Sequence, residues 1–114
     1  MAEIVQTISR HDTAEYFWMQ FLDETGQPLN LTGCTLVCTL VAPNGTYKLN
    51  RAAASIANQT TDLGWGYYAP NAADVNTSGR YRLEGEVTYP SGRKETRPRK
   101  ATWIVHIVDD LDNV

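Results

Sequence analysis

One stretch decides the fold class: Gly79-Arg-Tyr-Arg-Leu-Glu-Gly-Glu-Val-Thr-Tyr-Pro-Ser-Gly-Arg93. Its residues alternate between two faces. One face carries Tyr81, Leu83, Gly85, Val87 and Tyr89, and the other carries Arg80, Arg82, Glu84, Glu86 and Thr88. A period of two residues is typical of a β-strand with one buried face. The Pro-Ser-Gly that follows predicts a turn, so residues 80–89 and 93–97 are expected to form a hairpin.

Further strand candidates are separated by turn residues along the whole chain. They cover residues 3–8, 14–22, 34–42, 46–51, 64–69 and 101–108. Pro43-Asn-Gly45 predicts a second hairpin, because Asn-Gly is a strong two-residue turn signal. Residues 52–58 are expected to be strand or irregular, and residues 70–79 form a connection with room for one helical turn. The expected class is all-β.

The chain is expected to be a single domain, since 114 residues with 42% apolar content suffice for one core. Residues 1–12 are expected to form a short N-terminal arm and residues 109–114 an acidic tail. Each alternating strand has one apolar face that needs cover, which predicts a β-sandwich of about 7–8 mostly antiparallel strands. The predicted core contains Phe17, Met19, Phe21, Leu36, Leu40, Tyr81, Leu83, Val87 and Ile107.

Charge and hydropathy narrow the range of partners. The formal net charge of -3 argues against sequence-specific or general nucleic-acid binding, which needs a positive surface. The first residues lack a basic start followed by an apolar block, so no signal peptide is expected. No apolar run approaches the roughly 20 residues of a membrane span. Synthesis in a cytoplasm, with no membrane contact, is therefore expected.

No catalytic, metal or cofactor site is predicted. Cys34 and Cys38 share one face of a strand, where a rise of about 3.3 Å per residue puts their Cα atoms roughly 13 Å apart. This is too far for a disulfide, so both are expected in the core. His11 and Asp12 have no third ligand within reach in the sequence, and His106 is expected to be a structural or edge residue of its strand. No nucleophile elbow or phosphate-binding loop occurs. The chain is not expected to be an enzyme.

A basic run stands out near the end of the chain: Arg93, Lys94, Arg97, Arg99 and Lys100. One interpretation is a solvated hairpin, made soluble by charge. The other is a contact surface for a partner protein, including the acidic Asp109, Asp110 and Asp112 of a neighbouring copy.

Aromatic residues form a second candidate surface. Alternation puts Trp65 and Tyr67 on one face of their strand and Tyr68 on the other, while Trp18 and Tyr16 share a face of another strand. Such rings could complete the core, anchor a protein interface or stack on a sugar. Trp18 and Tyr68 are the predicted interface residues if the basic run is not used.

The order of these motifs resembles the N-terminal domain of phage baseplate upper proteins and related small phage structural proteins. The resemblance rests on Phe21-Leu-Asp-Glu-Thr-Gly-Gln-Pro-Leu-Asn-Leu-Thr-Gly33, on Pro43-Asn-Gly45 and on the strand and hairpin of residues 79–92, and it covers residues 15–108.

The resemblance implies an immunoglobulin-like β-sandwich in a tailed-phage virion, made in the host cytoplasm and acting by assembly with copies of itself and other virion proteins. Baseplate upper proteins continue into a long receptor-binding region, whereas this sequence ends at Val114. A baseplate, tail or neck adaptor and a capsid decoration protein are both consistent with it. A carbohydrate-binding module that uses Trp65, Tyr67 and Tyr68 is the alternative of another class.

Overall fold

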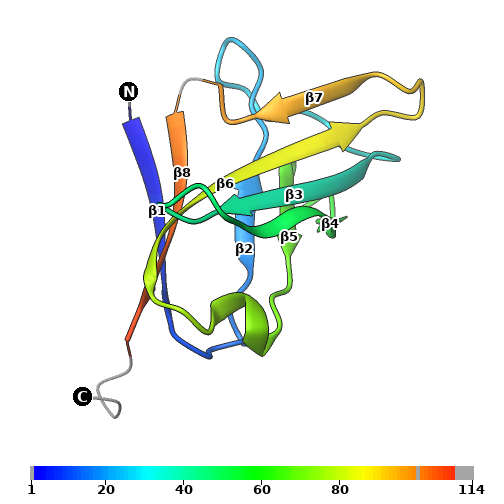
Figure 1. Ribbon diagram of the computed structural model, residues 1–114. Helices are drawn as coiled ribbons and strands as arrows, with labels where there is room; N and C mark the ends of the chain where they lie inside the picture. Colours follow the sequence, from blue (N-terminus) through cyan, green and yellow to red (C-terminus); the bar gives the residue numbers. More distant parts are fainter. Residues whose placement is uncertain (1, 100, 110–114) are drawn as a thin grey trace.

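The computed structural model describes residues 2–99 and 101–109 (Figure 1), and their fold is all-β with no α-helix. The eight strands are β1 (Ala2–Ser9), β2 (Phe17–Gln20), β3 (Thr35–Val41), β4 (Tyr47–Ile56), β5 (Trp65–Tyr68), β6 (Gly79–Thr88), β7 (Lys94–Arg97) and β8 (Ala101–Val108). One turn of 3₁₀ helix, Ala72–Val75, lies in the connection where a helical turn was expected.

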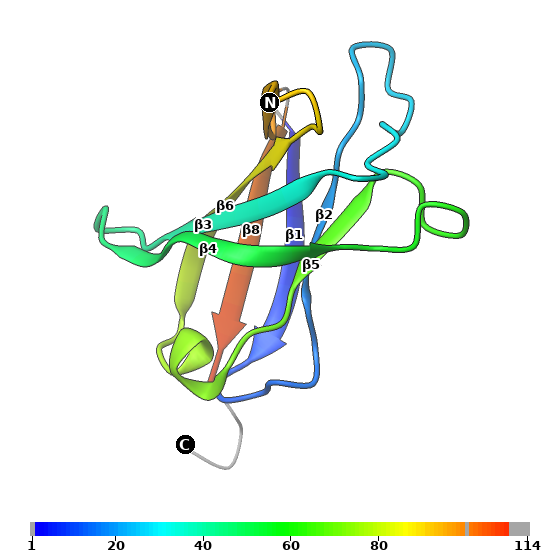
Figure 2. The same ribbon diagram turned by 90° about the vertical axis from the view of Figure 1, so that its right-hand side faces the viewer.

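The strands form one strongly curled sheet in the order β1-β8-β6-β3-β4-β5-β2. β8 pairs with the first half of β6, and β7 pairs with its second half. All neighbours are antiparallel except β1 and β8, which are parallel. The curl makes the sheet nearly barrel-shaped, so the two end strands, β1 and β2, come near each other (Figures 1 and 2). This gap between β1 and β2 positions the candidate site.

Strand β6 confirms the alternation that predicted it. Its burial alternates residue by residue from Tyr81 to Val87, and the inward face packs on β2 and β3. Gly85 belongs to that face because a Cβ there would lie 2.8 Å from Phe21 Cζ and 3.0 Å from Met19 Sδ. The small residue therefore leaves the space that two large core side chains fill.

The hairpin at Pro43-Asn-Gly45 is also confirmed, but the strand after it is longer than predicted. Ala42 N–H donates to Thr46 C=O at 2.8 Å across the turn. Strand β4 then continues to Ile56, past a positive φ of 56° at Arg51 and beside a register shift in β3. Such an irregularity bends a strand. It lets β4 pair first with β3 and then with β5.

All nine predicted core residues are buried. Sequence reasoning did not single out six other members of the same cluster, which are Ile8, Leu31, Leu49, Val75, Trp103 and Val105. Cys34 and Cys38 are free and buried, as expected. Burial raises the pKa of the Cys38 thiol to about 12, with a smaller contribution from the Asp74 carboxylate.

Two boundaries differ from prediction. Strand β2 has four residues instead of the nine of residues 14–22, because only Phe17–Gln20 pairs with β5. The strand predicted at residues 3–8 is confirmed and runs from Ala2 to Ser9, but it is not part of an arm, because it pairs with β8 from Ala2 with Ala101 to Ser9 with Val108. Of the predicted acidic tail, only Asp109 lies within the described residues.

Candidate functional site

The basic run does not form one exposed surface. Arg93, Lys94 and Arg99 are exposed, whereas Lys100 lies outside the described residues. Arg97 is buried at 5% exposure, which corrects the expectation that it faces a partner. The alternation of β7 explains this, because Arg97 lies on the strand's inward face opposite Gly85.

The buried Arg97 guanidinium is fully engaged. It donates from Nε to the Leu22 carbonyl at 3.0 Å, from one terminal nitrogen to the Thr96 carbonyl at 3.1 Å, and from the other to Glu95 Oε2 at 2.7 Å. The bond to Leu22 connects β7 to the segment that follows β2, and the other two bonds lie within β7. Arg97 is therefore a structural residue.

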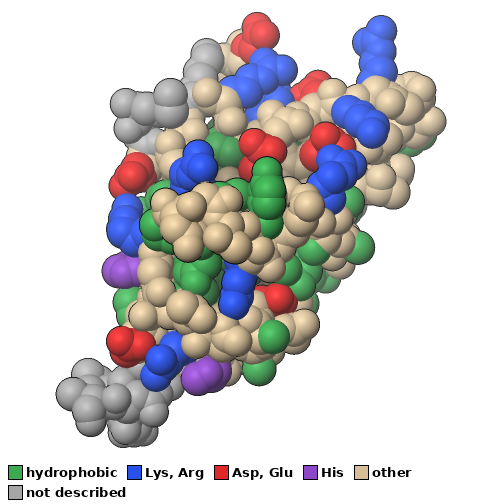
Figure 3. Space-filling view, viewed as in Figure 1, with side chains coloured by type: hydrophobic (Ala, Val, Ile, Leu, Met, Phe, Trp, Pro, Cys, Tyr) green, Lys and Arg blue, Asp and Glu red, His purple; other side chains and the backbone are tan. Residues whose placement is uncertain are grey.

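Several exposed basic side chains lie close to acidic partners in the same molecule. Arg99 lies 3.5 Å from Glu24, and Lys94 lies 3.9 Å from Glu86. Asp109, a predicted partner for a neighbouring copy, lies 3.4 Å from Arg10 of its own chain. Figure 3 shows blue and red side chains interspersed over the visible face. Charge alone therefore does not define a strong docking patch.

A cluster of four aromatic rings covers the outer face of β2 and β5, and we call it the outer aromatic cluster: Tyr16, Trp18, Trp65 and Tyr67. Tyr16 and Tyr67 stack at 4.8 Å between centroids, and Trp18 lies 5.2 Å from Tyr67 and 6.0 Å from Trp65. Tyr16 and Trp18 are both 40% exposed. The strands thus hold a contiguous aromatic surface outside the core.

Tyr68 lies on the opposite face of β5 and does not join this cluster. Its ring packs 5.7 Å from Phe17, and its hydroxyl donates to Asp74 Oδ2 at 2.7 Å. Burial, and then the bond to the Asp74 carboxylate, raise the pKa of Tyr68. Tyr68 and Trp18 therefore do not share a surface, contrary to the prediction that pairs them. Trp18 shares its surface with the other rings of the outer aromatic cluster instead.

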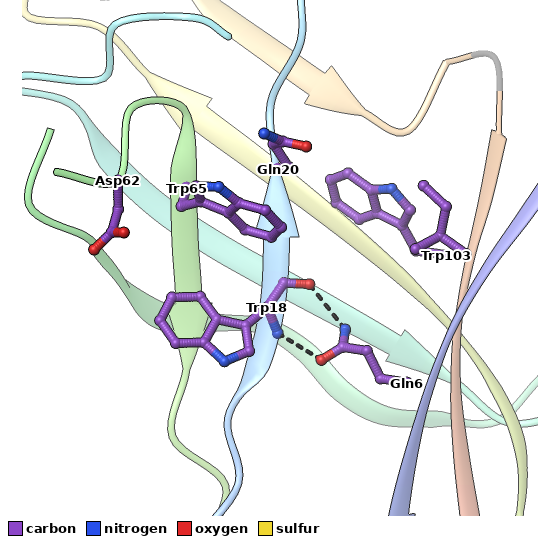
Figure 4. Close-up of a pocket in the computed structure, with 7 residues that line it drawn as sticks. Gln6, Trp18, Gln20, Asp62, Trp65 and Trp103 are labelled. Atoms are coloured by element: carbon purple, nitrogen blue, oxygen red, sulfur yellow. Dashed lines mark hydrogen bonds between the residues drawn. The ribbon is translucent and has the colours of Figure 1, made fainter.

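Beside this cluster, the gap between β1 and β2 contains a cavity of about 450 Å³, which we call the tryptophan slot. It is lined by Ile4, Gln6, Trp18, Gln20, Asp62, Trp65 and Trp103. Figure 4 shows how side chains from β1, β2, β5 and β8 gather around it. An adjoining cavity of about 370 Å³ shares Ile4, Gln20 and Trp103 and continues to the loop at Thr25.

The side chain of Gln6 extends across the slot from β1 to β2. Its Nε2 donates to the Trp18 carbonyl at 2.8 Å, and its Oε1 accepts from the Trp18 N–H at 2.9 Å (Figure 4). A carboxamide thus pairs with β2 as the backbone of a neighbouring strand would. This contact joins the two ends of the curled sheet.

Sequence reasoning missed the polar residues of the slot. Gln6, Gln20 and Asp62 belong to two strands and a loop that meet only because the sheet curls. The one available signal in the sequence was Gln6, which lies between Ile4 and Ile8 on one face of β1. Trp103 was likewise not predicted as a site residue. Its ring packs edge-on against Phe21 at 5.8 Å between ring centroids, and the residue is 6% exposed.

No family model and no curated protein matches the chain. Within residues 2–99 and 101–109, no three His, Cys, Asp or Glu side chains gather as a metal site would require. Among the same residues, no helix has the length and apolar character needed to cross a membrane.

Proposed function

We propose that this chain is a structural component of a tailed-phage virion that acts through protein–protein assembly, as a baseplate, tail or neck adaptor. The observation that carries the proposal is the outer aromatic cluster. Tyrosine and tryptophan dominate the energetics of protein interfaces, and contiguous exposed aromatic surface is uncommon on monomeric proteins. The motifs that resemble phage structural proteins add the virion context.

We further infer that the curled sheet is an immunoglobulin-like sandwich whose two layers are joined through β4. The pairing of β2, β5 and β4 on one side, and of β3, β6 and β8 on the other, supports this inference. It corresponds to strands B, E, D and C, F, G of that fold. Tyr81 adds support, because its hydroxyl donates to the Thr77 carbonyl at 2.8 Å just before β6, as a tyrosine corner does.

The charged hairpin would contribute to rate and specificity more than to affinity. Arg93, Lys94 and Arg99 are the exposed basic residues of the run that the structure describes. Exposed ion pairs contribute only about 0.2–1 kcal/mol each and weaken as salt screens them. The apolar rings are therefore the proposed anchor, with these charges at the rim.

Assembly is tested with a double variant of the two tyrosines, Tyr16→Ser with Tyr67→Ser, because neither lines the tryptophan slot. The wild-type protein should form oligomers, or a stable complex with a phage protein, in sedimentation experiments, and the double variant should remain a monomer. Tyr47→Ser is the matched control, since this ring is 60% exposed on β4, outside the cluster.

Particle composition tests the virion context. Mass spectrometry of purified particles should detect the wild-type chain, and electron microscopy of labelled particles should locate it at the tail or, for the capsid decoration alternative, on the head. A wild-type monomer that is absent from particles would refute the proposal. The predicted carbohydrate platform of Trp65, Tyr67 and Tyr68 is less supported, because Tyr68 does not share a face with the other two rings.

A further inference from the structure

The outward backbone edge of β2 has one unpaired position, and it faces the tryptophan slot. In an antiparallel pair, backbone groups point alternately toward and away from the partner strand. The groups of Trp18 point away from β5, because they bond to Gln6. The groups of Gln20, two residues on, therefore point the same way, and no described residue pairs with them.

Side chains close this edge on both sides of Gln20. Gln6 occupies the N–H and C=O of Trp18, and the Arg97 guanidinium donates to the C=O of Leu22 at 3.0 Å. An added strand needs alternate residues along several positions of an edge. Among the residues that the structure describes, one position of this edge is free, so the opening suits a compact ligand better than an extended peptide.

The lining of the slot determines the chemistry of that ligand. Indole rings of Trp18, Trp65 and Trp103 supply apolar walls, and Gln20 supplies a side-chain amide together with its backbone N–H and C=O. A pyranose ring combines apolar C–H faces, which stack on aromatic rings, with hydroxyls that both donate and accept hydrogen bonds. Small-molecule sites are typically apolar pockets that contain a small number of precisely placed polar groups.

Charge selects among saccharides. Asp62 is the single charged side chain that lines the tryptophan slot, and it makes no ion pair with a described residue. Its carboxylate can accept hydrogen bonds from sugar hydroxyls, but it would repel an acidic sugar. We propose that the tryptophan slot binds a neutral saccharide, with Trp65 as the stacking platform and Gln20 and Asp62 as hydrogen-bonding groups.

The adjoining cavity extends this site to a second sugar unit. It shares Gln20 and Trp103 with the slot and continues past Thr25 and Gly26 to Arg99. A neutral oligosaccharide should therefore bind more tightly than its monosaccharide. Trp18 and Trp65 belong to both the outer aromatic cluster and the slot, whereas Tyr16 and Tyr67 line neither cavity, so the tyrosine double variant separates saccharide binding from assembly.

The test uses the full chain and a panel of neutral mono-, di- and tetrasaccharides of glucose, galactose and N-acetylglucosamine, with a sialylated trisaccharide as the anionic control. Binding is measured by titration calorimetry and by shifts of the indole N–H signals of Trp18 and Trp65 in NMR spectra. At least one neutral oligosaccharide should bind saturably, and the sialylated one should not.

Variants locate the site. Trp65→Ala and Asp62→Asn should each weaken binding at least about tenfold, equivalent to about 1.4 kcal/mol. Asp62 is exposed, so its variant isolates binding from folding. Tyr47→Ala, which removes an exposed ring away from the slot, should leave affinity unchanged within a factor of two.

Three results would overturn the inference: no saturable binding by any neutral saccharide, binding that both slot variants leave unchanged, or binding of an extended Thr-Val repeat peptide that these variants abolish. The last result would assign the slot to strand addition instead. Sedimentation of the same samples separates this outcome from assembly, because the tyrosine double variant should still bind saccharide as a monomer.

Discussion

The carboxamide of Gln6 bonds to both backbone polar groups of Trp18, at 2.8 and 2.9 Å, and so bridges the two ends of the sheet. Edge strands expose unpaired N–H and C=O groups that invite association with other chains. At Trp18, the protein satisfies these groups with a side chain. The bridge leaves room beside it, whereas a continuous backbone ladder would have closed the tryptophan slot.

Replacing Gln6 by Ala should lower the free energy of unfolding by about 0.5–1.5 kcal/mol, because two hydrogen bonds of modest net value are lost. The Trp18 amide should also lose protection in hydrogen exchange. Gln27→Ala is the matched control, since this exposed glutamine makes no side-chain bond among the described residues, and its effect should stay within about 0.5 kcal/mol. Unchanged Trp18 protection would contradict the role of the bridge.

Arg97 and Arg99 should respond differently to substitution although they lie two residues apart. Arg97→Gln should destabilise the fold by roughly 2 kcal/mol or more. The substitution removes the buried guanidinium with its hydrogen bonds and leaves the Leu22 carbonyl without a donor. Arg99→Gln should change stability by less than about 0.5 kcal/mol, since Glu24 is highly exposed. Urea unfolding of both variants measures the contrast, and equal effects would refute it.

Tyr81→Phe tests the hydroxyl bond at the start of β6. The ring is 3% exposed and keeps its packing, so the loss should be near 1 kcal/mol, the net value of one hydrogen bond. Tyr47→Phe removes a hydroxyl from an exposed ring and should have no measurable effect. If Tyr81→Phe were equally silent, the bond to Thr77 would not stabilise the corner.

Stability should fall as the pH rises above about 9, and Cys38 should account for part of the fall. The unfolded thiol ionises near pH 8.5, whereas burial keeps the folded thiol protonated up to a pKa of about 12. Between these values the unfolded state binds fewer protons than the folded state, so the free energy of unfolding decreases with pH. Below the ordinary thiol pKa, the contribution is fully present.

Cys38→Ala provides the measurement. The variant loses packing at all pH values, so the informative quantity is the difference in unfolding free energy between about pH 8 and about pH 10.5. That difference should be smaller in the variant than in the wild type, while Cys34 and the tyrosines Tyr68, Tyr81 and Tyr89, whose pKa values burial also raises, contribute to the fall in both. An identical pH dependence would show that Cys38 does not titrate on unfolding in this range.

The strands and the core could be predicted because their signals are local. The alternation around Tyr81 and Val87 needs only a face to bury, and the turn at Asn44-Gly45 needs only its own backbone preferences. The length of β2 could not be predicted in this way. Its apolar pattern continues to Phe21, but its ladder stops at Gln20, which pairs with Trp65, the first residue of β5.

The site was harder to predict because its parts meet through the curl of the sheet. Gln6 contacts Trp18 because the two end strands converge, and no spacing in the sequence encodes that meeting. Arg97 was assigned to a surface because it stands among other basic residues. Its position opposite Gly85 in the ladder, and the carbonyl of Leu22 beyond it, determine its burial.

The parallel pairing of β1 with β8 also constrains how the chain can fold during translation. Ala2 pairs with Ala101, so β1 leaves the ribosome before β2 to β7 and finds its ladder partner only after these strands have been made. Until then Ile8, which is buried in the folded protein, has no β8 to cover it. Such long-range pairing slows folding. Nascent chains on one polysome would therefore present unpaired β1 strands close to one another.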